Sequence, residues 1–270
     1  MISGTGKESN KGCGGKWWWL LVIPAFAYLG LLTAAYLHAD HLIFAPHRAG
    51  YLPSAELLTL SNADQQRFCA YYLPPVKENG AVVLFSHGYN SDLSDLLERA
   101  HALNAEGYGV MLYDYQGYGL SQGRPSESAC YKDALAAYDF LVQELQLDSR
   151  QIIVYGHSLG AAVALELALQ RPVHYLLLDS PFVSAFRVVT RWPIIPWDKF
   201  DNLSKIARLP GSCYLEIRYS CQDEIIGCWH SKELYAASLR NADDTQRKLV
   251  QRVGAHDDYE FTQLPDIAEI

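Results

Sequence analysis

The sequence predicts an α/β fold in which a mainly parallel sheet of about eight strands carries helices on both faces. Continuous apolar runs such as Ala81–Phe85 are typical of strands covered on both faces, and they alternate with segments whose apolar residues recur at helical spacing. This alternation favours right-handed crossovers between parallel strands. Ligands of such sheets bind at the carboxyl ends of the strands, so the functional residues are expected there.

Local patterns predict the individual elements. Glu56–Leu60 and Arg67–Tyr72 alternate between apolar and polar residues, as strands do, and Pro74 and Pro75 end the second. The other expected strands are Ala81–Phe85, Val110–Tyr113, Ile152–Tyr155, Tyr175–Leu178, Tyr214–Arg218 and Lys248–Val253. Helices are expected around Leu93–Leu103, Tyr131–Leu145 and Ala161–Gln170.

Length and charge limit the class of protein. The 270 residues, of which 50% are hydrophobic, suit one folded domain with an N-terminal appendage. The net charge of −8 argues against nucleic acid as a partner, because no basic patch is present to neutralise phosphates.

The appendage is predicted to be a membrane anchor. Residues 17–37 carry no formal charge, and a helix of about 21 residues rising roughly 1.5 Å per residue matches a hydrocarbon core of roughly 30 Å. Aromatic residues stand at both ends of the run, as in an aromatic belt: Trp17, Trp18, Trp19 and Tyr36. We therefore expect a disordered segment at 1–16, a transmembrane signal anchor at 17–37 and a folded domain at 42–270.

Charges beside the anchor predict its orientation. Lys7, Lys11 and Lys16 precede the apolar run, and no formal positive charge follows it directly. The positive-inside rule then places the folded domain on the extracytoplasmic side. A cleaved signal peptide is the alternative, because Thr33-Ala34-Ala35 resembles a cleavage site, although the apolar run is longer than a usual signal peptide core.

The pentapeptide Gly156-His157-Ser158-Leu159-Gly160 predicts a nucleophile. It stands between an apolar run and an alanine-rich helical segment, and a serine at such a strand-to-helix corner is lifted above the sheet edge. Glycines at positions 156 and 160 avoid collisions in the tight turn. The alternative is an ordinary glycine-serine turn between a strand and a helix.

A serine nucleophile needs a base, and the base needs an acid that orients it. His256 follows the last expected strand and is the predicted base, whereas His174 and His230 are expected to be surface or packing residues. Asp223, after the strand Tyr214–Arg218, is the predicted acid. Asp179, one strand earlier, and Glu224 are the alternatives.

The reaction also needs donors for the negative charge that develops on the carbonyl oxygen. We expect them to be the backbone amides of Leu159, at the start of a helix, and of Tyr89, after the strand Ala81–Phe85. Gly88 permits the turn that this second donor requires; an ordinary glycine turn is the alternative. The side chains of His87 and Tyr89 are expected to line the site.

Several motifs together resemble the α/β-hydrolase superfamily, in particular the membrane-associated subfamily that includes eukaryotic protein depalmitoylases. The motifs are Ser86-His87-Gly88-Tyr89-Asn90, Tyr113–Gly123, Gly156–Gly160, Asp179-Ser180-Pro181-Phe182 and Asp223-Glu224. The resemblance runs from about Leu42 to the C-terminus, and the Asp-Tyr-x-Gly-Tyr-Gly-x-Ser-x-Gly segment is its most specific part. Arg218-Tyr219 departs from it, because many relatives carry His-Gly there.

The resemblance implies an α/β-hydrolase fold, a Ser158–Asp223–His256 triad and no metal or organic cofactor. It further implies hydrolysis of acyl esters or thioesters. A site beside a membrane favours acyl chains presented by a lipid or an acylated protein, and small soluble esters are the alternative.

The stretch between Asp179 and Asp223 is too short for a large lid domain, so the lid is expected to be minimal. Phe182 and Trp192 are expected to contact substrate, the latter in the apolar stretch Trp192–Trp197, which could equally cover the core. Acyl transfer on the same triad and a non-catalytic, membrane-tethered binding module are the alternative functions.

The cysteines contain no CxxC pair, so a structural zinc site is not expected. In an oxidising compartment Cys221 and Cys228 could form a disulfide that braces the acid loop. Two free thiols are the alternative.

Overall fold

The computed structural model describes residues 18–77, 80–242, 244–259 and 264. The predictions for residues 1–16 and for Trp17 lie outside this part of the chain. The chain divides into two compact units, Met1–Ala39 and Asp40–Ile270, each described by itself.

The first unit consists, in its described part, of helix α1 (Trp19–Ile43), which continues into the first residues of the second unit. Its mean hydropathy reaches 2.0, and it is long and apolar enough to cross a membrane. The helix ends six residues later than the expected anchor (43 − 37 = 6). A signal sequence would meet the same criteria, so both expectations for this segment stay open.

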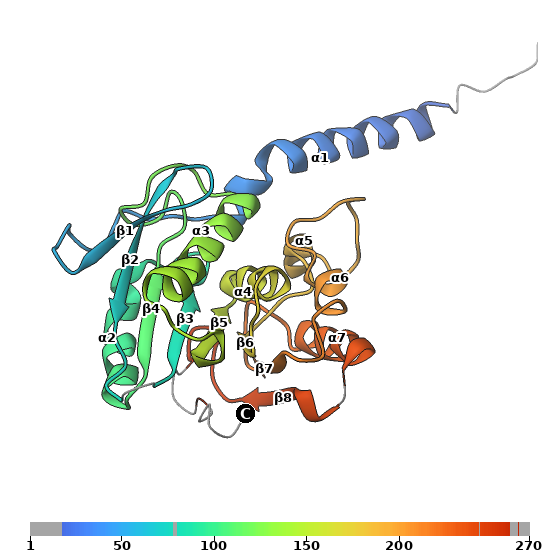
Figure 1. Ribbon diagram of the computed structural model, residues 1–270. Helices are drawn as coiled ribbons and strands as arrows, with labels where there is room; N and C mark the ends of the chain where they lie inside the picture. The colour runs from blue at the N-terminus through green and yellow to red at the C-terminus, as the bar shows by residue number, and fades with distance from the viewer. Residues whose placement is uncertain (1–17, 78–79, 243, 260–263, 265–270) are drawn as a thin grey trace, which may run out of the picture. The chain divides into compact units, whose positions relative to one another are not determined.

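The second unit is built on one eight-stranded sheet in the order β1-β2-β4-β3-β5-β6-β7-β8 (Figure 1). The strands are β1 (Leu57–Ser61), β2 (Arg67–Leu73), β3 (Val82–Ser86), β4 (Gly109–Tyr113), β5 (Ile152–His157), β6 (Tyr175–Asp179), β7 (Tyr214–Ser220) and β8 (Arg247–Arg252). Among the described strands, β1 pairs antiparallel with β2 and β2 antiparallel with β4, whereas the other pairs are parallel.

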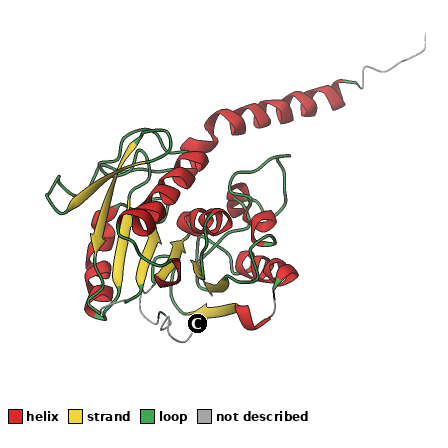
Figure 2. Ribbon diagram, in the orientation of Figure 1, coloured by secondary structure: helices red, strands yellow, loops and turns green. Residues whose placement is uncertain are grey.

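Helices cover both faces of the sheet (Figure 2). The helices are α2 (Leu93–Ala105), α3 (Glu127–Asp139), α4 (Leu159–Gln170), α5 (Ala185–Val189), α6 (Asn202–Ile206) and α7 (Trp229–Ser238). A π-helical turn, Phe140–Glu144, continues α3, and three short 3-10 turns complete the set: Ser149–Gln151, Leu239–Asn241 and Asp244–Gln246. Helix α3 begins four residues before the expected helix (131 − 127 = 4), because Ser126 caps its amino end.

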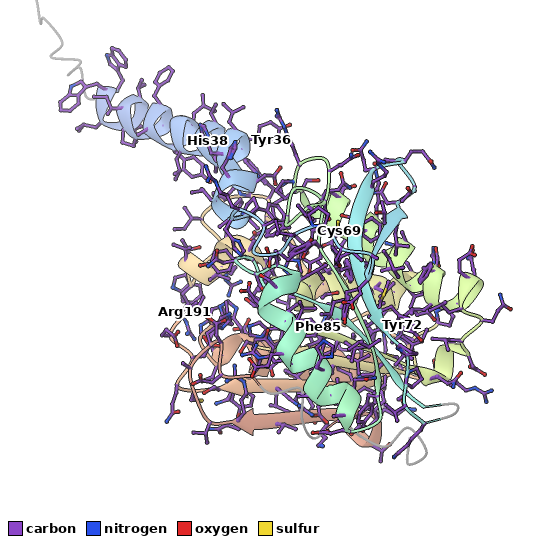
Figure 3. All side chains as sticks on the ribbon, turned by 90° about the vertical axis from the view of Figure 1, so that its left-hand side faces the viewer. Tyr36, His38, Cys69, Tyr72, Phe85 and Arg191 are labelled. Carbon is purple, nitrogen blue, oxygen red and sulfur yellow. The ribbon has the colours of Figure 1, made fainter. Side chains whose placement is uncertain are left out.

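Two apolar clusters hold these layers together. The larger joins one face of the sheet to α3, α4, α6 and α7, and the smaller joins the other face to α2. Phe85 of β3, labelled in Figure 3, is fully buried in the smaller cluster. Strands β3 to β6 alternate side chains between the two clusters, which explains why they are apolar throughout. The predicted α/β-hydrolase fold is therefore confirmed.

Candidate active site

Ser158 lies at the corner between β5 and α4, with a backbone φ of 54°. A positive φ is strained for a residue with a side chain, and it turns the chain sharply enough to raise the serine above the sheet. A side chain at either flanking position, 156 or 160, would collide with nearby backbone atoms, so both positions require glycine. A Cβ on Gly156 would overlap the carbonyl group of Gly160, and one on Gly160 would overlap the carbonyl of Ser86 on neighbouring β3.

The structure brings together the three residues predicted as nucleophile, base and acid. Ser158 Oγ lies 2.9 Å from His256 Nε2, and His256 Nδ1 lies 2.8 Å from Asp223 Oδ2. In the tautomer that satisfies both contacts, the Nδ1–H donates to the carboxylate and the serine hydroxyl donates to Nε2. His256 and Ser158 are both almost fully buried, at 2% and 5% exposure, so bulk water hardly competes for these contacts.

Asp223 is held as a carboxylate. Burial alone would raise its pKa, but the hydrogen bonds from His256 and from the Ile226 amide outweigh burial and lower the pKa to about 2. Ser180 Oγ donates a further hydrogen bond of 2.8 Å to Asp223 Oδ2. The acid therefore stays ionised at neutral pH and can stabilise a protonated imidazole.

The two alternative acids have other contacts. Asp179 at the end of β6 pairs with Arg252 at 3.0 Å and accepts a hydrogen bond from the Tyr155 hydroxyl. Glu224 accepts from the backbone amide of His256, not from its ring. Asp223 is thus the carboxylate that contacts the imidazole.

The loop after β3 runs beside the serine. A Cβ on Gly88 would lie 3.9 Å from Ser158 Cβ, so this backbone borders the nucleophile. Two tyrosines fix the loop from the other side: Tyr115 Oη donates to the carbonyl of His87, and Tyr118 Oη donates to the carbonyl of Tyr89. Both tyrosines come from the motif that carries the family resemblance, which explains structurally why that motif accompanies the site.

A cavity of about 420 Å³ opens at Ser158. Its lining is polar on the side of α2 and aromatic at Tyr89 and Tyr259. The lining residues are Gly88, Tyr89, Asn90, Ser91, Asp95, Glu98, Arg99, His157, Ser158, Ile225, His256, Asp257 and Tyr259.

Of the four residues expected to contact substrate, only Tyr89 lines this cavity. His87 is fully buried, its ring packs in a tilted arrangement against Tyr115, and burial lowers its pKa to about 4. Phe182 packs edge-on against Phe200 in the core. Trp192 lies in the chain after α5, away from the cavity lining, with 74% of its surface exposed.

Sequence reasoning missed the contribution of α2. Asp95, Glu98 and Arg99 lie on one helical face, at spacings of three and four residues, opposite the apolar face. This charged face was visible in the sequence, but the pattern alone does not tell a solvated face from the wall of a site. Tyr259 was missed as well. Its ring stacks on His157 at 3.9 Å and lies under the guanidinium of Arg99 at 4.2 Å.

Side chains that could bind a metal ion, and two cysteine thiols, also lie near the site. Two groups of described residues place potential ligand atoms within 4.8 Å of one another: His157 with His256 and Asp257, and His47 with Asp92 and Asp95. Cys221 and Cys228, on either side of Asp223, are free thiols in the structure. The proposed disulfide is therefore absent from the described conformation.

Comparison with known proteins places this geometry in a family. The profile of the family described as serine aminopeptidase, S33, matches residues 77–248. The chain belongs to this family of α/β hydrolases. An uncharacterized protein of Mycobacterium tuberculosis is 32% identical to this α/β hydrolase, over 88% of each chain. The mouse alpha/beta hydrolase domain-containing protein 17C is 28% identical over 68% of this chain and 58% of its own.

Solved structures agree with the fold of this α/β hydrolase. An esterase of Pyrococcus furiosus superposes with a TM-score of 0.64 at 18% identity, covering 79% of this chain and 90% of its own. The thioesterase domain from the curacin biosynthetic pathway gives 0.55 at 18% identity, covering 76% and 94%. The family resemblance stated from the sequence is confirmed.

Proposed function

We propose that this α/β hydrolase is a membrane-anchored serine hydrolase that cleaves carboxylic esters or thioesters of acyl chains. One observation carries the proposal: the continuous hydrogen-bonded series from Ser158 through His256 to Asp223, at 2.9 and 2.8 Å. This series supplies a nucleophile, a base and an orienting acid in one arrangement.

The reaction follows from these contacts. Ser158 Oγ attacks the substrate carbonyl carbon while its proton passes to His256 Nε2, and the carbonyl electrons move onto the oxygen. The amides of Leu159 and Tyr89 stabilise that oxyanion; a single such donor contributes roughly 3 kcal/mol in the transition state. The carbon–oxygen or carbon–sulfur bond then breaks, and the leaving group takes the proton from His256. Water, deprotonated by the same histidine, releases the acid from the acyl-enzyme.

Two observations support the proposed substrate class, namely the structural neighbours and the apolar helix α1. Structural neighbours include both an esterase and a thioesterase domain. Helix α1, if it is not cleaved, would anchor the enzyme to a bilayer, and acylated lipids and proteins are presented on bilayers. We propose that it does remain, and that the enzyme domain lies on the extracytoplasmic side.

The test is hydrolysis of p-nitrophenyl esters from acetate to palmitate by the full chain in detergent, beside Ser158→Ala. A matched series of acyl thioesters, read by thiol release, separates ester from thioester preference. We expect turnover that Ser158→Ala lowers by about 10⁶-fold, together with labelling of Ser158 by a fluorophosphonate. Folded protein that neither turns over nor becomes labelled would contradict the proposal and favour a binding module.

A further inference from the structure

His157, the residue before the nucleophile, is a buried histidine. Its residue is 2% exposed, and neither ring nitrogen has a hydrogen-bond partner among the described residues. Its Nε2 lies 3.6 Å from Asp257 Oδ1, which is longer than a hydrogen bond. Buried polar groups usually have a hydrogen-bond partner, and a ligand bound from the cavity that His157 lines would supply one.

The surroundings of His157 supply further ligand atoms. Its ring centroid lies 4.9 Å from that of His256. Asp257, with 83% of its side chain exposed, lines the same cavity. The ligand atoms of these three residues all lie within 4.8 Å of one another. His256 Nδ1 bonds Asp223, so Nε2, which lies 2.9 Å from Ser158 Oγ, is the nitrogen that this ring can offer to a metal ion.

We propose that His157, His256 and Asp257 form a binding site for Zn²⁺ that reversibly inhibits the hydrolase. Two imidazoles and one carboxylate are a ligand set that suits zinc better than magnesium or calcium, which prefer oxygen ligands. Tetrahedral zinc with ligands at about 2.0–2.2 Å needs them roughly 3.3 Å apart, and the His157–Asp257 separation of 3.6 Å is close to that. The inhibition rests on the proposed function, because one ligand is the proposed base.

The contacts around the two candidate metal sites favour this cluster over the group His47, Asp92 and Asp95. Asp223 accepts from the Nδ1–H of His256, which is the contact that usually orients a zinc-bound histidine. By contrast, the Asp92 carboxylate of the second group already accepts hydrogen bonds from the amides of Gly50 and Ser94. Bound zinc would occupy the His256 lone pair, so Ser158 would lose the group that accepts its proton.

The experiment titrates ZnCl₂ into the full chain in detergent and measures the rate of fluorophosphonate labelling and the rate of ester hydrolysis. We expect zinc to slow both reactions, a chelator to restore them, and magnesium to leave them unchanged. His157→Gln and Asp257→Asn should each raise the half-inhibitory zinc concentration at least tenfold, relative to that variant's own zinc-free rate. His174→Gln, which removes an exposed histidine before β6, is the matched control and should behave as wild type.

Each outcome has a defined meaning. Labelling that proceeds normally and is unaffected by zinc would overturn the zinc site while leaving the proposed function intact. Asp257→Asn changes an exposed side chain, so this variant should fold as wild type does. Inhibition that persists unchanged in it would place the site elsewhere and overturn the proposal. If the serine is never labelled, the proposed function fails. Calorimetric binding of zinc to Ser158→Ala then still decides the site, and we expect binding at least as tight as in wild type.

Discussion

The guanidinium of Arg252 lies 3.0 Å from the carboxylate of Asp179, so the acid at the end of β6 is neutralised by a residue at the end of β8. The same guanidinium donates to Ser180 Oγ and to the carbonyls of Ala255 and His256. Ser180 in turn donates to Asp223. Arg252 therefore links the segment that carries His256 to Ser180, which in turn holds Asp223.

The first prediction separates the two aspartates. Asp223→Asn should lower kcat by about 10⁴-fold, because the imidazole loses its orienting acceptor. Asp179→Asn should lower the free energy of unfolding by about 3 kcal/mol, because it leaves the guanidinium of Arg252 without its buried partner. Steady-state kinetics and urea unfolding of both variants in detergent provide the comparison. Equal losses of kcat in two folded variants would refute the assignment of the acid.

The second prediction concerns Ser180. Ser180→Ala removes one hydrogen bond to the Asp223 carboxylate, and we expect kcat to fall about tenfold, which corresponds to about 1.4 kcal/mol, with little change in KM. Ser184→Ala is the control. It lies in the same loop and is buried, but its side chain makes no capping hydrogen bond to α5. A Ser180→Ala enzyme with wild-type kcat would show that the acid is held sufficiently without this contact.

The third prediction concerns two glycines beside the nucleophile. Gly160→Ala should destabilise the fold by about 3 kcal/mol or more, because its Cβ would overlap the backbone of Ser86 and neither strand nor helix can move freely. Gly88→Ala should fold normally, since its Cβ meets His157 Cδ2 at 3.5 Å, an ordinary van der Waals distance. Thermal unfolding distinguishes the two variants. Similar melting temperatures would argue against the tight packing of α4 on β3.

The fourth prediction concerns pH and Asp114. Burial raises the pKa of this carboxyl to about 8, despite hydrogen bonds from Tyr51 and from the Leu93 amide. The folded protein then holds a proton between about pH 4 and pH 8 that the unfolded chain has lost. This contribution to stability is complete below about pH 4 and disappears as the pH rises through 8.

Asp114→Asn should remove that slope, since an amide does not titrate. Urea unfolding of both proteins at pH 5, 6, 7 and 8 tests this. The free energy of unfolding should fall with pH more steeply in wild type than in Asp114→Asn. Parallel curves would mean that Asp114 has an ordinary pKa in the folded protein.

The order of the strands and helices was predictable from the sequence, and so were Ser158, His256 and Asp223, because each depends on a local sequence pattern. Ser158 is marked by its flanking glycines, and Asp223 and His256 by their positions directly after expected strands. In a parallel sheet these strand ends share one edge, so the chain order alone brings the residues together. Strands β3 to β6 are apolar on both faces, so their continuous apolar runs were also visible in the sequence.

The wall of the cavity was not predictable, because it depends on how α2 packs across the sheet. Asp95 and Glu98 border the site only because the opposite face of α2 is buried against β3 and β4. The role of Arg252 was equally hidden, since its contacts with Asp179 and Ser180 join positions more than 70 residues apart. Phe182 was misplaced because an aromatic residue after a strand end can turn into the core as well as toward a ligand.

Strand β8 lies at the edge of the described sheet, where β7 is its neighbour, yet the segment that follows it carries His256. Fraying of an edge strand costs less free energy than opening the interior strands that carry Ser158. Such a local opening would move His256 away and leave Ser158 in place. The protein would then pass through a state that is largely folded but catalytically inactive. Mild heat or denaturant should therefore switch the enzyme off reversibly before the core melts.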